Sequence, residues 1–287
     1  MMSIINAALA KMNVNKPQRL FIAHLLSLFA FFQGKATYRN LARFSHYCEK
    51  TFARWFAKDF NFAELNTLML HQQIYNQNEP ELIAALDASY IDKSGKHTPG
   101  LGNFWNGSLQ QSQMGLEASL LSVVDVKANT AYALDIRQTV DMETTEAQTD
   151  KKTRPVFYAE QVVENISRLK ELGIMYLATD AYYSKEKFIT PVTEAGLHLV
   201  GKLRIDANLQ LPWEGEYSGK GRPKRFSGKL NINGDLGRLT FVGKDENGVD
   251  IYTVRAYSQS MKMWLRIVLL RSEKKVKYLK LCCFQQM

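Results

Sequence analysis

The sequence predicts a mixed α/β fold that follows a small all-α region. The first part of the chain favours helices, because its apolar residues cover most faces of the helices that they would form. From residue 81 onward, short apolar runs typical of buried strands alternate with helical segments. Beyond residue 205 the pattern becomes β-rich and basic. The expected parts are a helical DNA-binding region at 1–78, an α/β core at 79–205 and a β-rich basic part at 206–287.

Composition favours a soluble globular protein with an anionic partner. Of the 287 residues, 46% are apolar and 23% are charged, which is ordinary for a chain with a real core. The balance of 37 Lys+Arg against 28 Asp+Glu is less ordinary, because it gives a net charge of +9. Such a surplus favours nucleic acid first and acidic membrane surfaces second.

Neither a membrane segment nor a disulfide framework is predicted. The apolar run at 20–32 is too short to span a bilayer and contains His24, so we expect a core helix there. The three cysteines, Cys48, Cys282 and Cys283, fit no zinc spacing and suit a reducing cytoplasm. We therefore expect a cytoplasmic, nucleoid-associated protein with no membrane partner.

Two short helices in the first region have a helix-turn-helix outline. A long helix over 16–33 is expected to end at Gly34. Shorter helices over 37–44 and 48–56 then flank a turn at 45–47.

The second short helix carries cations at a spacing of four residues. Lys50, Arg54 and Lys58 share one face, where a recognition helix would place groups that reach phosphates and bases. The alternative is an ordinary helical hairpin with a solvated basic face. Lys50 and Arg54 are candidate DNA-binding residues.

A polar linker at 72–80 leads into the core. The predicted strands cover 82–91, 118–126, 130–138, 174–179 and 197–204, and the predicted helices cover 155–172 and 184–195. Three consecutive strands, a helix, a fourth strand and a helix follow the order of the ribonuclease-H-like fold. In that fold the first and fourth strands are adjacent and parallel.

An aspartate closes the apolar run of each of these two strands. Asp87 follows the run at 82–86, and Asp180 follows the run at 174–179. An ionised carboxylate at a buried strand needs compensation, and a divalent cation between two such groups provides it. Two metal ions about 3.5–4 Å apart are a standard device for attacking phosphodiesters. Taken singly, each aspartate is more often a loop or cap residue than a ligand.

Residues beside the two aspartates suit a nucleic-acid substrate. Lys93 and Lys96 could bind phosphate groups. Tyr182 and Tyr183 could stack on a displaced base, although packing is the commoner role of such tyrosines.

A cation cluster opens the β-rich part, in a Gly/Pro loop. Arg222, Lys224 and Arg225 belong to it, and strands are expected afterwards over 237–243, 249–257 and 263–271. The loop is either a solvated hairpin tip or a segment that enters a narrow minor groove. In both cases it should give salt-dependent affinity for DNA.

Three blocks of sequence together resemble the insertion-sequence transposases of the DDE superfamily. The block at 87–102 resembles their first catalytic-aspartate block, the block at 179–204 resembles their second, and 221–225 resembles the basic loop that follows. The likeness spans roughly residues 20 to 270.

The resemblance implies a ribonuclease-H-like core with a β-rich insertion. It implies that Asp87 and Asp180 are catalytic and ligate Mg²⁺ or Mn²⁺. It also implies cleavage at the ends of a mobile element and strand transfer, with double-stranded DNA of terminal repeats and target as partner, and a homodimer on that DNA.

One element of the family pattern is missing. These enzymes take a third carboxylate from a glutamate on a downstream helix, and no such helix precedes Met287, so a truncated and impaired copy is expected. Tyr252, Arg255, Gln259 and Arg266 mimic the spacing of a Tyr-Arg-Glu-Lys signature, but the segment alternates like a strand.

Three functions stay open. The first is a transposase, the second is a non-catalytic DNA-binding inhibitor or repressor of transposition, and the third is a nuclease unrelated to transposition.

Overall fold

The protein divides into two compact units in the computed structural model. One unit contains residues 1–80 together with Tyr132–Asp135, and the other contains the remaining residues. The structure describes residues 2–74, 80–93, 95, 98–139, 153–204, 206–217, 219, 221–231, 236–272 and 275–283. Within this described part, no helix has both the length and the apolar character that a membrane span needs.

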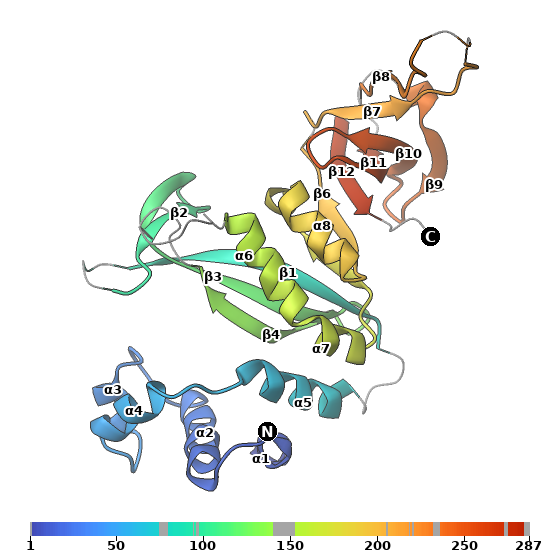
Figure 1. Ribbon diagram of the computed structural model, residues 1–287. Helices are drawn as coiled ribbons and strands as arrows, with labels where there is room; N and C mark the ends of the chain where they lie inside the picture. Colours follow the sequence, from blue (N-terminus) through green and yellow to red (C-terminus); the bar gives the residue numbers. More distant parts are fainter. Residues whose placement is uncertain are drawn as a thin grey trace. The chain divides into compact units, whose positions relative to one another are not determined.

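Helices form the first unit (Figure 1). They are α1 (Met2–Lys11), α2 (Lys16–Phe29), α3 (Tyr38–Arg43), α4 (Glu49–Phe56) and α5 (Phe62–Ile74). The short helices α3 and α4 contact each other, and they confirm the two helices expected over 37–44 and 48–56.

Side-chain caps fix where these helices begin. Asn15 caps α2 by accepting a hydrogen bond from the Gln18 amide at 2.9 Å. Thr37 caps α3 in the same way, through the Asn40 amide at 3.2 Å. The expected end of α2 at Gly34 is wrong: the helix stops at Phe29, because the next amides bond three residues back and tighten the last turn.

Phe21 of α2 lies at the centre of an aromatic cluster in this unit. The residue is 2% exposed, and its ring stacks on Trp55 with centroids 5.5 Å apart. The rings of Tyr47, Phe52 and Phe56 also contact it. The helices therefore share one apolar core, in which Leu25, Leu28 and Leu41 are also buried.

Strands and helices alternate in the second unit. The strands that form its core are β1 (Leu82–Asp92), β2 (Gly102–Asn106), β3 (Gln111–Asp125), β4 (Thr130–Gln138), β5 (Tyr176–Thr179) and β6 (His198–Lys202). The helices are α6 (Arg154–Glu164), α7 (Ile166–Glu171), the 3₁₀ turn η1 (Ala181–Tyr183) and α8 (Glu186–Glu194).

These strands form one side of a mixed sheet. The order is β2-β3-β1-β5-β6, and β4 pairs with β3. β1 is antiparallel to β3. It is parallel to β5, as the sequence predicts for the strands expected over 82–91 and 174–179. Alternate residues of β3 are buried, which agrees with a sheet that is covered on one face. The covering helices are α6 and α8, which lie side by side over the sheet in Figure 1.

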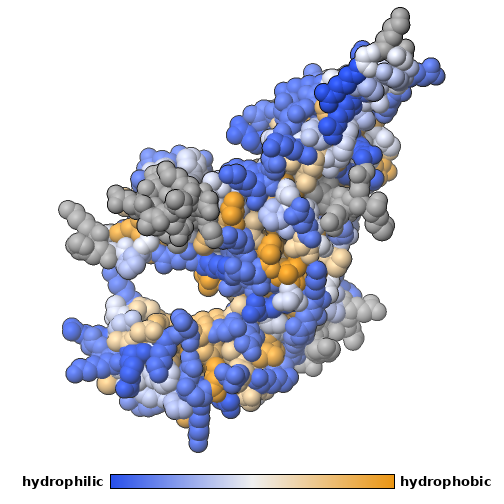
Figure 2. Space-filling view, viewed as in Figure 1, coloured by the Kyte–Doolittle hydropathy of each residue, from blue (hydrophilic) through white to orange (hydrophobic). Residues whose placement is uncertain are grey.

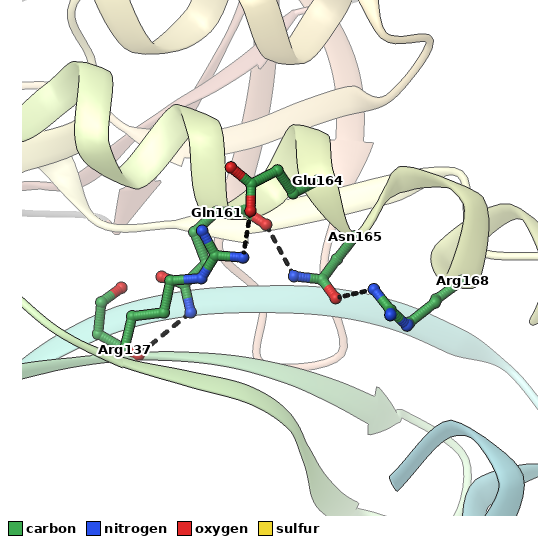
Figure 3. Close-up of polar contacts among 6 residues, drawn as sticks. Arg137, Gln161, Glu164, Asn165 and Arg168 are labelled. Atoms are coloured by element: carbon green, nitrogen blue, oxygen red, sulfur yellow. Dashed lines mark hydrogen bonds and ion pairs between the residues drawn. The ribbon is translucent and has the colours of Figure 1, made fainter. Parts of the chain in front are cut away.

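Asn165 splits the helix that the sequence predicts over 155–172. Its side-chain amide donates to the Gln161 carbonyl at 2.9 Å and its oxygen accepts from Arg168 at 2.9 Å (Figure 3). Because the side chain occupies the carbonyl four residues back, the Asn165 backbone amide bonds to Val162 instead. The Arg137–Glu164 ion pair, at 2.8 Å, ties the end of α6 to β4.

The rest of the sheet is the β-rich part. It contains β7 (Leu209–Pro212), β8 (Phe226–Lys229), the 3₁₀ turn η2 (Leu236–Arg238), β9 (Thr240–Lys244), β10 (Asp250–Ser258), β11 (Met263–Ser272) and β12 (Lys275–Cys283). The order continues β6-β12-β11-β10-β7-β8, so β12 joins this part to the core. The signature-like spacing that begins at Tyr252 lies on strands β10 and β11 and the turn between them, so it is not helical.

Hydrophilic side chains cover most of the face that Figure 2 draws, and hydrophobic side chains gather there in small patches. This distribution agrees with the large charged fraction of the sequence.

Candidate active site

Strand pairing places the two predicted catalytic aspartates at the same level of the sheet. The last paired residues of β1 and β5 are Leu86 and Thr179, which face each other in parallel register. Asp87 and Asp180 are the residues that directly follow them. Adjacent strands lie about 4.8 Å apart, so the two residues are neighbours across the edge where the pairing ends.

Backbone hydrogen bonds orient each carboxylate. Asp180 is the N-cap of η1, where its Oδ1 accepts from the Tyr182 amide at 2.9 Å. The Oδ1 atom of Asp87 accepts from the Ala88 amide at 3.0 Å. The described contacts leave the Oδ2 atom of each residue without a hydrogen bond, so each carboxylate keeps an oxygen that could bind a ligand.

The carboxylates open onto a pocket of about 470 Å³. Its walls combine acids, aromatic rings and one arginine, and they are lined by Asp87, Ala88, Trp105, Glu117, Arg154, Tyr158, Asp180, Tyr182 and Tyr183. Trp105 and Tyr182 are 56% and 42% exposed, so their rings stand at the rim. The pocket is open to solvent.

The surroundings of Asp87 disfavour its charge. The residue is exposed, but the pocket walls remove part of the water around the carboxylate, and this desolvation raises its pKa above the ordinary value. The Ala88 hydrogen bond lowers the pKa, and the nearby Asp180 charge raises it. Two repelling carboxylates of this kind are stabilised by a cation between them.

This donor set fits a hard divalent cation. Carboxylate oxygens are the ligands that Mg²⁺ and Mn²⁺ prefer, and Mg²⁺ commonly takes only one or two protein carboxylates together with substrate phosphate oxygens. Asp87 and Asp180 would supply that pair. Among the described residues, no group of three or more His, Cys, Asp or Glu side chains is placed to hold a metal ion.

A buried acid forms the floor of the pocket. Glu117 on β3 is 7% exposed, and the Tyr158 hydroxyl of α6 donates a hydrogen bond to its Oε1. Burial first, and then Glu117, raise the pKa of Tyr158, so the phenol keeps its proton. The neighbouring Tyr183 is 2% exposed, which shows that this tyrosine packs in the core and does not stack on a base.

We expect Tyr158→Phe to destabilise the second unit by about 1–3 kcal/mol, because a buried carboxylate would lose its hydrogen-bond donor. Urea denaturation followed by circular dichroism measures this change. Tyr176→Phe is the matched control, since Tyr176 is 42% exposed and the change should stay within about 0.5 kcal/mol. Equal effects of the two substitutions would contradict a structural role for the Tyr158 hydroxyl.

The predicted DNA-binding residues that the structure describes do not line this pocket. Lys50 and Arg54 are exposed on α4, and Lys93 is exposed just after β1. Lys96 lies outside the described residues.

The basic loop of the β-rich part presents its cations next to aromatic rings. Arg222, Lys224 and Arg225 are exposed. The Lys224 ammonium lies 4.8 Å from the Trp213 ring centroid, and the Arg225 guanidinium lies 4.7 Å from that of Tyr257. The structure thus brings Asp87 and Asp180 together, but it gives no contact between them and these cations.

Several pocket residues were missed from the sequence. Glu117 had a usable signal, because a charged residue occupies a buried position in the alternating pattern of β3. Arg154 and Trp105 had no signal in the sequence, since only the fold brings α6 and β2 to the two aspartates.

The comparisons with known proteins identify the family of the chain. The sequence model of a family described as DDE superfamily endonuclease matches residues 37–246, which is well over half of the chain. The chain therefore belongs to the DDE superfamily endonucleases, a class of nucleases.

Other comparisons add little. No curated protein matches the chain. The crystal structure of the catalytic domain of human endonuclease V is similar, with a TM-score of 0.32 and 12% sequence identity over 96% of this chain and 84% of that chain. A likeness this weak supports no conclusion about fold or function.

Proposed function

We propose that the chain is a DNA transposase of the DDE type, which cuts phosphodiester bonds at insertion-sequence ends and transfers the strand to target DNA. The observation that carries this proposal is the β1–β5 register, which makes Asp87 and Asp180 neighbours at one edge of the sheet. The family match supports DNA cleavage, and the resemblance of the blocks around the two aspartates supports transposition.

The arrangement of the core supports a ribonuclease-H-like fold. Apart from the short β2, the core strands follow in the chain order β1, β3, β4, β5 and β6, and helices come after β4 and after β5. β1 is antiparallel to β3 and parallel to β5, and β5 is parallel to β6. We also propose the division into a DNA-binding region at 1–78, a catalytic core at 79–205 and a β-rich basic part at 206–287.

In the proposed reaction Asp87 and Asp180 would hold Mg²⁺ or Mn²⁺ through their carboxylate oxygens. A metal held there would activate the attacking water or 3′-hydroxyl and stabilise the charge on the leaving oxygen. The Asp180 side chain is held by the Tyr182 amide, so its free oxygen is already oriented when the ligand arrives.

Cations outside the pocket would bind the rest of the DNA. Lys50 and Arg54 on α4, Lys93 after β1, and Arg222, Lys224 and Arg225 of the basic loop are exposed and suited to phosphates. Lys96 is proposed from the sequence alone. The homodimer on DNA and the nucleoid association stay predictions.

Removing divalent metal tests the proposal. We expect the purified chain to nick supercoiled DNA with Mg²⁺ or Mn²⁺, and to lose this activity in EDTA, because two carboxylates without a cation offer no electrophilic stabilisation. Agarose gels measure the nicked fraction. Asp180→Asn, purified in parallel, is the control for contaminating nuclease. Asparagine can still accept the hydrogen bond from the Tyr182 amide but carries no charge to bind the metal, so nicking by this variant would come from a contaminant. Nicking that persists in EDTA would contradict the proposal.

The second candidate is a non-catalytic DNA-binding protein that occupies element ends and inhibits transposition. The observation that favours it is that, among the described residues, no third acid is placed with Asp87 and Asp180 to hold a metal ion. Gel shifts distinguish the two functions: salt-dependent binding with no metal-dependent nicking supports the inhibitor. Nicking without joining to a second DNA supports a nuclease that does not transpose.

A further inference from the structure

Two cations adjoin the pocket beside Asp180, and the reaction proposed above leaves them without a role. Arg154 is the first residue of α6 and lines the pocket. Its guanidinium lies 4.7 Å from the Phe104 ring centroid and donates to the Asn103 carbonyl at 2.7 Å. These contacts hold the arginine at the pocket wall.

Lys185 stands beside the Tyr182 ring. Its ammonium lies 3.7 Å from the ring centroid. Burial raises the pKa of the Tyr182 phenol, and the nearby charge of Arg154 lowers it. The amide of Tyr182 donates the hydrogen bond that orients the Asp180 carboxylate. One tyrosine thus links both cations to the position of a proposed catalytic carboxylate.

The charge of these cations is available to a ligand. None of the ion pairs that the described residues form includes Arg154 or Lys185, whereas Lys262 is paired with Glu186 at 3.0 Å. Three acids line the pocket, and an anionic strand would be repelled there unless cations faced it. Arginine offers a planar fork for two phosphate oxygens, and lysine offers a compact charge.

We propose that Arg154 and Lys185 bind phosphate groups of the DNA strand that enters the pocket, next to the bond that is cut, and that Tyr182 positions both cations. This inference rests on the proposed function. It assigns to the pocket itself a phosphate-binding role in addition to that of the surface lysines and arginines. The alternative is that Arg154 only ties α6 to β2.

The salt dependence of DNA binding tests the inference. The probe is a fluorescent 30-base-pair duplex, titrated with the full chain without divalent metal at several salt concentrations. Each phosphate contact contributes about 0.9 to the slope of log K against log salt. We expect Arg154→Gln and Lys185→Gln each to reduce the slope by about one and to weaken binding severalfold. The double variant should reduce the slope by about two.

Matched variants separate a phosphate contact from other effects. Lys187→Gln removes an exposed lysine of the same helix, α8, and should change the slope less than Lys185→Gln. Arg154→Lys keeps the positive charge but loses the planar guanidinium that can bind two phosphate oxygens. The slope of log K against log salt should therefore persist, while the kcat of nicking falls. Thermal denaturation of each variant identifies any loss of folding, and Lys185→Gln keeps a side chain of similar length that should fold.

The possible results differ for the inference and for the proposed function. Unchanged slopes in Arg154→Gln and Lys185→Gln, or an equal loss in Lys187→Gln, overturn the inference, even if the wild-type chain nicks DNA. Reduced slopes in a chain that shows no metal-dependent nicking support the phosphate contacts and leave only the catalytic proposal refuted.

Discussion

Replacing Asp87 with asparagine is expected to slow metal-dependent nicking about a thousandfold and, without metal, to raise the melting temperature. Loss of a metal ligand removes several kcal/mol of transition-state stabilisation, and ~1.4 kcal/mol corresponds to a tenfold rate change. The gain in stability follows because the charged Asp87 carboxylate is unfavourable in the folded chain. The pocket walls desolvate it, and the charge of Asp180 repels it.

The stability change should depend on pH in a defined direction. Folding raises the pKa of Asp87, so the folded chain binds its proton more tightly than the unfolded chain. Wild-type stability is therefore lost as the pH rises from the unfolded pKa, about 3.9, through the raised folded value. The amide introduced by Asp87→Asn cannot titrate, so the variant should be the more stable protein above this range, and the difference should disappear below it.

Thermal denaturation at several pH values, with and without Mg²⁺, measures both effects. Mg²⁺ should raise the melting temperature of the wild-type chain but not that of Asp87→Asn, because a ligand stabilises only the state that binds it. Asp92→Asn is the control, since Asp92 is an exposed carboxylate on the same strand. If Asp87→Asn nicks DNA as fast as Asp92→Asn does, Asp87 is not a metal ligand.

Phe21→Ala is expected to cost about 3–5 kcal/mol and to unfold the helical unit, because it removes the ring at the centre of that unit's aromatic cluster. Most of the free energy of unfolding of a unit of this size would be lost. DNA binding that depends on α4 should then disappear, whereas metal-dependent nicking by the second unit should persist.

Tryptophan fluorescence during urea denaturation measures this loss, because Trp55 is the one tryptophan within residues 1–80. Phe31→Ala is the matched control, since Phe31 is 59% exposed and its truncation should change stability by less than about 0.5 kcal/mol. If the Trp55 fluorescence of Phe21→Ala changes at the same urea concentration as that of the wild-type chain, the aromatic cluster does not stabilise the unit.

The sequence was sufficient for the features that depend on local pattern. Apolar runs ending in an acid predicted β1 and β5, and the ribonuclease-H-like order of the elements predicted that Asp87 and Asp180 meet, because few strand orders are compatible with such a sequence of elements. The observed strands β1, β3 and β4 confirm the strands expected over 82–91, 118–126 and 130–138, although β3 begins earlier, at Gln111.

Features that depend on tertiary structure were missed. The strands β2, β7 and β8 contain only five, four and four residues, too few for a pattern to stand out in the sequence, and they are defined by their partners. β12 was not predicted either, and the strand expected over 237–243 begins only at Thr240, after the turn η2. The break at Asn165 depends on one side chain that competes for a backbone carbonyl, and the pocket residues Arg154 and Glu117 come from separate elements.

Strand β6 has a consequence for how the two ends of the second unit work together. Its main chain is hydrogen-bonded to β5 on one edge and to β12 on the other. Strand β5, which precedes Asp180, and strand β12, which leads to the β-rich part, are thus connected through the backbone hydrogen bonds of β6 and not through a flexible loop. A displacement of the β-rich strands would therefore be transmitted to the strand that precedes Asp180, through a connection only as long as His198–Lys202.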